Sequence, residues 1–333
     1  MSKVLILAPF SDTQLERLRS RLEVMYESWM DTGKLLSSEQ FIERLEGDGI
    51  DFLVVEADFV QRDVFEKVSR LQLLGVCRGD AFQIDVQAAT DNGVLVVNTP
   101  ARNATAVAEL TVGLMLSLAR RITEAHDMVR SGRWVDPTAA YFSMRGSELS
   151  GKTIGIIGFG AIGRKVAKFV SAFDTAVLAC DPYITAEQMG DCGAEKVSLD
   201  QLMSVSDYVS IHCSTIAGTV GLINERRIAM MKQTAYLVNA ASSYVIDEEA
   251  LFTALKERRI AGAGFDVYSS WPVRADSPLL TLDNVVLTPH IGGATAETIE
   301  RHSTMIADDI ERYLNGERPL HLLNPEIWGR SAG

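Results

Sequence analysis

A glycine-rich turn between a β-like run and a helix-like run constrains the fold of this chain most strongly. The turn reads Gly158-Phe159-Gly160-Ala161-Ile162-Gly163 and follows the aliphatic run 153–157. In a strand–turn–helix of this kind, the first glycine allows the tight turn, the second lets the backbone approach a pyrophosphate, and the third lets the helix pack on the sheet. Backbone N–H groups and the positive end of the helix then face the phosphates. The stretch therefore predicts a dinucleotide site.

The residues after the turn support this interpretation, since their apolar members recur at helical spacing and predict an amphipathic helix packed on a sheet. These members are Ile162, Val166, Phe169, Val170 and Phe173. A second strand-like run, 177–180, ends at Asp181, where an acidic residue accepts hydrogen bonds from the adenosine ribose and repels a 2′-phosphate. The pattern favours NAD over NADP, whereas a merely tight turn would need three glycines by accident.

Composition narrows the class of protein. The 333 residues predict roughly two domains, and no segment approaches the roughly 18 unbroken apolar residues of a membrane span. A net charge of −12 without a Lys/Arg cluster argues against nucleic acid. Four cysteines without CxxC or Cys/His spacing indicate neither a disulfide framework nor a metal site. We expect a cytoplasmic protein with a small-molecule substrate and no metal, membrane or nucleic-acid partner.

Short β-branched or aliphatic runs alternate with helical stretches, which predicts an α/β fold with parallel sheets. The expected strands are 4–8, 24–29, 52–56, 73–76, 94–97, 153–157, 177–180, 208–212, 236–239, 263–267 and 285–288. Thr99-Pro100 marks the end of a first domain, and a helix from about 294 to 315 leads the chain back to it. We expect one domain from 1–100 plus 296–333 and another from 101–295. A single long helix, 104–130, is apolar on most sides in its first half, so it lies between domains or against another subunit.

Further motifs follow one another along nearly the whole chain. They are Asn98-Thr99-Pro100 with Ala106-Val107-Ala108-Glu109, the glycine turn, His212 with Thr219 and Gly221-Leu222-Ile223-Asn224, Asn239 before 245–251, Gly264-Phe265-Asp266-Val267, and Thr288-Pro289-His290-Ile291-Gly292-Gly293. In this order the chain resembles the D-2-hydroxyacid dehydrogenases, in the phosphoglycerate dehydrogenase-like branch. The resemblance implies a flavodoxin-like substrate domain, a Rossmann-like NAD domain, a cleft between them with hinges near 100 and 290, and a homodimer built around the helix near 104–130.

The resemblance also assigns site residues. It places the general acid/base at His290, and a histidine suits that role because imidazole titrates near neutrality. The expected cofactor-binding residues are Gly158, Phe159, Gly160, Ala161, Ile162, Asp181, Pro182, His212, Cys213, Ser214, Thr219, Asn239, Ala240, Ala241, Asp266, His290 and Gly293. Of these, Asp181 and Pro182 bound the adenosine ribose, 239–241 lie on the nicotinamide side, and Asp266 faces the carboxamide.

Two positions depart from the family pattern. The substrate-clamping arginine falls on Ser242, three residues after Asn239, and the glutamate that pairs with the histidine falls on Trp271, before Pro272. Without the glutamate His290 is less easily protonated. Without the arginine a 2-keto acid loses its bidentate partner and the developing oxyanion loses positive charge. Ordinary 2-hydroxyacid dehydrogenase activity is therefore expected to be weak.

Further residues are candidates for the substrate site. Arg78 lies in a predicted substrate loop, and Arg102 and Asn103 lie in the hinge loop, where either arginine binds a carboxylate or phosphate or is simply solvated. Trp271 is a stacking wall for a sugar-like or aromatic substrate, or it closes the pocket. Ser242 can hydrogen-bond a hydroxyl but supplies no charge.

These residues predict an NAD-dependent oxidoreductase with an atypical site that acts on a polar hydroxy or keto acid or a sugar-acid-like substrate. The alternatives are a catalytically degenerate NAD-binding sensor or scaffold, and a non-redox reaction that uses bound NAD transiently.

Overall fold

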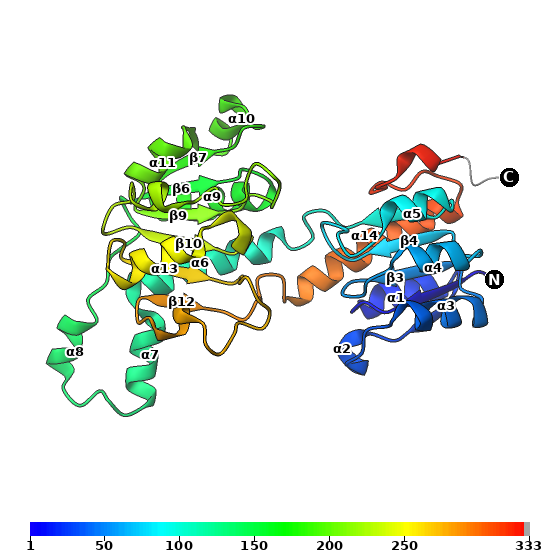
Figure 1. Cartoon of the computed structure of the whole chain (residues 1–333), viewed down its shortest axis with the longest axis horizontal. Coiled ribbons are helices and arrows are strands. Elements are labelled where there is room, and N and C mark those ends of the chain that lie inside the picture. The colour runs from blue at the N-terminus through cyan, green and yellow to red at the C-terminus, as the bar shows by residue number, and fades with distance from the viewer. Residues whose placement is uncertain (330–333) are drawn as a thin grey trace. The chain divides into compact units, whose positions relative to one another are not determined.

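The computed structural model describes residues 1–329 and consists of two compact units, each a parallel β-sheet with helices on both faces (Figure 1). Unit 1 is Met1–Arg102 together with the chain from Thr295 onward, and unit 2 is Asn103–Ala294. The expected α/β class with two parallel sheets is confirmed. The expected division lay at 100/101 and 295/296, and the last four residues of that expectation, 330–333, lie outside the described residues.

The sheet of unit 1 has the order β2-β1-β3-β4-β5. Its strands are β1 (Lys3–Ile6), β2 (Glu23–Tyr26), β3 (Phe52–Val55), β4 (Leu73–Val76) and β5 (Leu95–Asn98). The three strands β3, β4 and β5 are buried along their whole length, as aliphatic strands covered on both faces are expected to be. One face packs against α3 (Ser38–Gly47), α4 (Arg62–Lys67) and α5 (Val86–Asp91), and the other against α1 (Asp12–Arg19) and α14 (Ala296–Leu314).

The chain after α14 runs along the free edge of this sheet. The backbone N–H of Asn98 donates to His321 O at 3.1 Å and that of Leu323 donates to Val96 O at 2.8 Å. The bridge between Val97 and Leu322 is antiparallel. A short 3-10 turn, η3 (Pro325–Ile327), follows. This segment covers backbone groups that an edge strand leaves unpaired.

The sheet of unit 2 has the order β12-β11-β10-β9-β6-β7-β8. Its strands are β6 (Thr153–Ile157), β7 (Ala176–Cys180), β8 (Glu195–Lys196), β9 (Tyr208–Ile211), β10 (Tyr236–Asn239), β11 (Gly262–Phe265) and β12 (Val285–Leu287). One face packs against α6 (Ala104–Arg120), α9 (Ala161–Ser171) and α10 (Ala186–Gly190). The other packs against α11 (Leu199–Val205), α12 (Glu225–Ile228) and α13 (Glu248–Lys256), and the 3-10 turns η1 (Ser243–Val245) and η2 (Pro278–Thr281) lie in loops.

The expectation of one helix over 104–130 is wrong. The helix ends at Arg120, because Arg121 adopts the left-handed conformation (φ 52°, ψ 42°), and α7 (Ile122–Arg130) starts anew. The guanidinium of Arg121 donates to the carboxylate of Glu124 and to the carbonyl oxygen of Ser143 at the end of α8 (Pro137–Ser143), which holds the break. Both α7 and α8 stand out from the body of unit 2 (Figure 1).

Two strands also differ from the sequence prediction. The strand expected over 24–29 stops at Tyr26, because Ser28 accepts a hydrogen bond from Met30 N and caps α2 (Trp29–Thr32). The two-residue strand β8 was not predicted, since its residues are charged and exposed. No helix of residues 1–329 is long and apolar enough to cross a membrane. The same residues contain no group of three or more His, Cys, Asp or Glu that could hold a metal ion.

Candidate functional site

The glycine turn between β6 and α9 is held by close backbone packing. Gly158 has φ +90°, and a Cβ on it would lie 2.5 Å from Cys213 N, in the loop after β9. A Cβ on Gly163 would lie 2.2 Å from Gly158 O. Real Cβ atoms do not approach other atoms this closely, so both positions require glycine. The turn, the start of α9 and the loop after β9 are therefore packed backbone to backbone.

Gly160 differs from its two neighbours, because a Cβ on it would meet no atom within 4 Å. This residue is the N-cap of α9, and no side chain caps the helix. The first N–H groups of a helix lack intrahelical partners and favour an anion. The open side of Gly160 and the uncapped α9 therefore suit the pyrophosphate of a dinucleotide, and Ala161 and Ile162 begin the helix beside it.

Asp181 joins the end of β7 to the glycine turn. One carboxylate oxygen accepts from Phe159 N and the other from Tyr183 N, both at 2.8 Å. Each carboxylate oxygen accepts more than one hydrogen bond, so capacity remains for ribose hydroxyls. Pro182 and Tyr183 are exposed beside it. The geometry fits an adenosine ribose at the position where the sequence predicts one.

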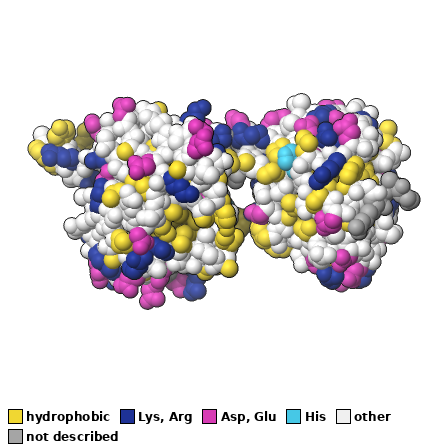
Figure 2. All heavy atoms as spheres, turned by 90° about the horizontal axis from the view of Figure 1, so that it is seen from above, with side chains coloured by type: hydrophobic (Ala, Val, Ile, Leu, Met, Phe, Trp, Pro, Cys, Tyr) yellow, Lys and Arg dark blue, Asp and Glu magenta, His cyan; other side chains and the backbone are white. Residues whose placement is uncertain are grey.

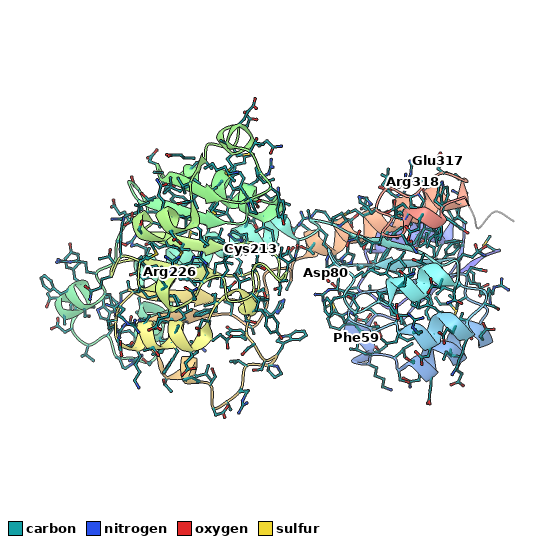
Figure 3. The ribbon with its side chains drawn as sticks, turned by 45° about the horizontal axis from the view of Figure 1, so that its top comes forward. Phe59, Asp80, Cys213, Arg226, Glu317 and Arg318 are labelled. Atoms are coloured by element: carbon teal, nitrogen blue, oxygen red, sulfur yellow. The ribbon has the colours of Figure 1, made fainter. Side chains whose placement is uncertain are left out.

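The loop after β9 contains His212, Cys213, Ser214 and Thr219. His212 Nε2 lies 2.7 Å from Ser210 Oγ, and its buried Nδ1 has no partner among the described residues. Burial lowers the pKa of His212 to about 3, so its imidazole is neutral near pH 7, and burial raises the pKa of the Cys213 thiol to about 11. The hydroxyl of Thr219 donates to Ser214 O at 2.7 Å. Figure 3 labels Cys213 in this loop.

The loop after β10 is shaped by the side chain of Asn239. Its Oδ1 accepts from Ala241 N at 3.1 Å and from Ser242 N at 3.2 Å, and its Nδ2 donates to Ser242 O at 2.9 Å. Asn239 is buried, whereas Ala240 and Ala241 are partly exposed, as is Ser242. The amide therefore fixes the backbone on which Ser242 stands.

Asp266, at the end of β11, organises the loop of His290. Its buried carboxylate accepts from Thr288 Oγ1 at 2.6 Å, Ile291 N at 2.8 Å and Gly292 N at 2.7 Å. His290 has φ +57° and is exposed. A left-handed conformation is costly for a residue other than glycine and persists where surrounding contacts enforce it. Asp266 thus holds the loop on both sides of His290.

Trp271 contacts His290. The ring centroids are 5.4 Å apart with an interplanar angle of 46°, and Trp271 is 78% exposed. The resemblance gives this position to a glutamate. An indole against the imidazole supplies apolar contact but no negative charge, so it does not stabilise an imidazolium as a carboxylate does.

Of the two arginines predicted near the substrate, Arg102 is already engaged within unit 1. Its guanidinium lies 2.6 Å from a carboxylate oxygen of Glu56 and 2.6 Å from Nδ1 of His302, and both side chains of the ion pair are largely buried. Burial lowers the pKa of His302 to about 4, and Nε2 donates to Pro9 O at 2.7 Å. Asn103 belongs to unit 2, where its side chain lies against Gly293.

Arg78 has a looser environment, in the loop after β4. Its Nε lies 3.6 Å from Asp80 and makes no hydrogen bond within the described residues. The guanidinium carbon lies 5.0 Å from the ring centroid of Phe82, which packs edge-on against Phe59. Figure 3 labels Phe59 and Asp80 at the same edge of unit 1. This is the carboxyl edge of the sheet, where open α/β sheets bind ligands.

The sequence analysis missed Thr215 and Tyr268. Thr215 Oγ1 donates to Ser242 Oγ at 2.6 Å, and Tyr268 OH donates to Thr288 O at 2.8 Å, beside the His290 loop. Threonine and tyrosine in loops carry no distinctive sequence signal, so only the pairing of β9 with β10 and of β11 with β12 identifies them.

Acidic and basic side chains are interspersed on the face seen in Figure 2.

Comparison with known proteins gives consistent matches. The family model described as D-isomer specific 2-hydroxyacid dehydrogenase, NAD binding domain, matches residues 112–292. A glyoxylate reductase of Thermofilum pendens is 41% identical over 83% of this chain and 81% of its own length. A D-3-phosphoglycerate dehydrogenase of Methanocaldococcus jannaschii is 38% identical over 97% of this chain, which spans 60% of that relative. Among solved structures, the TT0316 protein of Thermus thermophilus superposes with a TM-score of 0.85 and 31% identity, over 96% of this chain and 99% of its own.

Proposed function

The chain belongs to the D-isomer specific 2-hydroxyacid dehydrogenase family, an NAD-dependent group of oxidoreductases, and from this premise we propose its substrate and its acid/base residue. The proposed substrate is a polar hydroxy or keto acid, or a sugar-acid-like compound. The proposed general acid/base is His290. The resemblance places an arginine and a glutamate where this chain has Ser242 and Trp271, so the site is atypical.

The anchoring of the His290 loop by Asp266 carries this proposal. Three hydrogen bonds of 2.6–2.8 Å from Thr288, Ile291 and Gly292 converge on one buried carboxylate. They support a fixed position for His290, whose side chain remains exposed. A group that is held in place yet reachable by solvent is suited to proton transfer with a small molecule.

His290 exchanges the proton of the substrate oxygen. When a hydroxyl is oxidised, the neutral imidazole removes the O–H proton, and when a ketone is reduced, the protonated ring returns it. Bound NAD supplies the hydride acceptor or donor. Trp271 brings an indole ring to the imidazole where the resemblance gives a glutamate, so the His290 ring has no carboxylate from this position.

Within unit 1, Arg78 is the predicted arginine that we propose is available to an anionic group such as a carboxylate or phosphate. Among residues 1–329, its guanidinium has one ion-pair partner, the Asp80 carboxylate at 3.6 Å. Arg102, by contrast, is engaged by Glu56 and His302. The names of the two relatives, glyoxylate reductase and D-3-phosphoglycerate dehydrogenase, also point to small anionic substrates.

The proposed function is tested by following NADH formation and consumption with a panel of hydroxy acids, sugar acids, 2-keto acids and keto-sugars. NADH binding is measured in parallel from its fluorescence. We expect turnover with at least one sugar acid and slower turnover with simple 2-keto acids. Protein that binds NADH but turns over no member of the panel contradicts the proposal.

One observation favours an alternative, a catalytically degenerate NAD-binding sensor or scaffold. The Trp271 ring occupies the place beside His290 that the resemblance gives to a catalytic glutamate. On this alternative, NADH binds and changes the conformation without any turnover. The same panel distinguishes the two, because a sensor shows NADH binding and no substrate-dependent loss of NADH.

We also propose a homodimer built on α6, α7 and α8. Exposed apolar side chains gather on and between α7 and α8, at Ile122, Val129, Trp134, Val135, Tyr141 and Phe142. Exposed apolar patches of this kind mark protein contacts. Sedimentation equilibrium tests the dimer, and a monomer at micromolar concentration contradicts it.

The four cysteines are free thiols, which suits the reducing cytoplasm we expect.

A further inference from the structure

We propose that Thr215 and Ser242 form a neutral recognition site for a substrate hydroxyl on the carbon next to the one that is oxidised. The inference rests on the proposed function and adds to it the class of substrate. The substrate then presents a vicinal diol to the site, and its carboxylate lies further along the molecule.

The hydrogen bonds of the pair set its donor and acceptor capacity. Ser242 Oγ accepts from Thr215 Oγ1 at 2.6 Å and from Tyr244 N at 3.3 Å. A hydroxyl oxygen has two acceptor lone pairs and one hydrogen to donate. Both acceptor positions of Ser242 are therefore used and its hydrogen is free. Thr215 has used its hydrogen, and its lone pairs are free.

The pair thus offers one donor and one acceptor side by side. A substrate hydroxyl donates its hydrogen to Thr215 Oγ1 and accepts the hydrogen of Ser242 Oγ, so it satisfies both groups. An ionised carboxylate only accepts, so it would leave the acceptor lone pairs of Thr215 unfilled. None of the groups that hydrogen-bond to Ser242, from Thr215, Asn239 and Tyr244, is cationic. A carboxylate bound here would lose water without gaining a charged partner, which is unfavourable.

The position of the pair relative to His290 supports this role. Thr215 follows β9, Ser242 follows β10 and His290 follows β12, and neighbouring strands from β9 to β12 are paired in parallel. Their carboxyl ends therefore lie along one edge of the sheet. Asn239 holds the Ser242 backbone through hydrogen bonds to its N–H and its carbonyl oxygen. The Ser242 side chain is presented rigidly on the same edge as the proposed acid/base.

Oxidation changes one carbon of the vicinal diol and leaves the neighbouring hydroxyl intact. Bound NAD would accept the hydride from the oxidised carbon, while His290 takes the O–H proton and a C=O bond forms. The neighbouring hydroxyl keeps its hydrogen and is bound by Thr215 and Ser242. The product is an α-hydroxy ketone.

The test compares threonate and erythronate, which carry adjacent hydroxyls, with 3-hydroxybutyrate, which lacks the second hydroxyl, and with lactate, whose carboxylate adjoins the carbinol. We expect wild-type protein to prefer a diol over 3-hydroxybutyrate by at least about 100-fold in kcat/KM. Ser242→Ala and Thr215→Val are each expected to reduce this ratio about tenfold. Ser204→Ala, which removes an exposed hydroxyl bonded within α11, leaves the ratio unchanged.

A purely structural role for the pair would lower kcat/KM for all substrates together and leave the ratio constant, which overturns the inference. Wild-type protein that oxidises lactate as well as threonate also overturns it, while the proposed function stands. If no compound is oxidised although NADH binds, both fail. Ser242→Arg is expected to reverse the preference, raising lactate oxidation at least about tenfold, because it adds the cation that a carboxylate requires.

Discussion

Two stretches of the same sheet edge in unit 2 differ in how their shape is set. One depends on close backbone packing and the other on exposed side chains. At the ends of β6 and β7, the turn region consists of Gly158–Gly163 and Asp181, and its shape is set by backbone atoms that approach within 2.2–2.5 Å of where a Cβ would be. At the ends of β10, β11 and β12, the reaction region consists of Ser242, Trp271 and His290, whose side chains are partly or well exposed. Gly158 and Gly163 of the turn region leave no room for a Cβ atom, whereas the exposed side chains of the reaction region can be exchanged with less effect on packing.

This difference is what we expect of a chain that keeps its cofactor turn while its reaction region departs from the pattern that the resemblance implies. Glycines 158 and 163 are required by the close backbone packing of this turn. The side chains of Ser242 and Trp271 are partly or well exposed, so core packing does not dictate them.

The largest effect is expected for Gly158→Val. Its Cβ would lie 2.5 Å from Cys213 N, and φ +90° is unfavourable for a β-branched residue. We expect a loss of about 3–5 kcal/mol in the free energy of unfolding of unit 2. Thermal unfolding with NADH titration checks this. Gly160→Ala is the matched control, because its methyl group points into open space and should weaken NADH binding without destabilising the fold.

The next effect is expected for Ser242→Arg combined with Trp271→Glu. The double variant returns a cation and a carboxylate to the reaction region, and we expect 2-keto acid reduction to rise about 100-fold in kcat/KM. NADH binding should change little, since the turn region is untouched. Steady-state reduction of pyruvate and glyoxylate measures it. No gain, in a folded variant that binds NADH, means that these two residues do not explain the atypical site.

The pH dependence of the free energy of unfolding is expected to reveal two buried neutral histidines. His212 lies in the loop beside the turn region, and His302 lies in unit 1. Burial lowers their pKa values to about 3 and about 4. A histidine with a folded-state pKa below its unfolded value of 6.5 contributes stability above pH 6.5, and that contribution is lost as the pH falls towards the folded-state pKa. We expect this loss to be on the order of 2 kcal/mol for each residue.

His212→Gln should flatten the acid dependence of unfolding for unit 2, and His302→Gln should do so for unit 1. Hydrogen exchange followed by mass spectrometry between about pH 4 and pH 7 resolves the two units. Equal flattening in both units by either variant contradicts this assignment.

The smallest effect is expected for Asp266→Asn. The amide keeps one acceptor for the three donors that meet at this position, so the His290 loop loosens. We expect about a tenfold fall in kcat and a smaller fall in NADH affinity, since Asp266 is also predicted to face the nicotinamide carboxamide. A fall in NADH affinity without a fall in kcat would assign Asp266 to the cofactor instead.

The sequence predicts the turn region well because its physical requirements are local. A strand, three glycines, a helix and Asp181 lie within a short stretch, and the spacing alone indicates the geometry. The α/β class follows in the same way from alternating strands and helices. The break at Arg121 could not be predicted, since it depends on a left-handed residue held by Glu124 and by the chain near Ser143.

The reaction region is harder to predict because its properties arise from contacts between distant segments. The anchoring of Thr288, Ile291 and Gly292 by Asp266 joins residues 22–26 positions apart. The pairing of Thr215 with Ser242 joins residues 27 positions apart, and no motif signals it. In unit 1, the engagement of Arg102 by His302 spans 200 positions. This contact distinguishes Arg102 from Arg78, although the sequence predicts both equally as substrate-binding residues.

The central claim is that His290 transfers a proton in an NAD-dependent oxidation, and single-turnover kinetics of His290→Ala with the best substrate of the panel tests it most directly. His126→Ala, which alters an exposed histidine of α7, is the matched control. The account predicts that His290→Ala binds NADH within about twofold of wild type but forms NADH about 1,000-fold more slowly, while His126→Ala behaves as wild type. Formation of NADH by His290→Ala at the wild-type rate would contradict it.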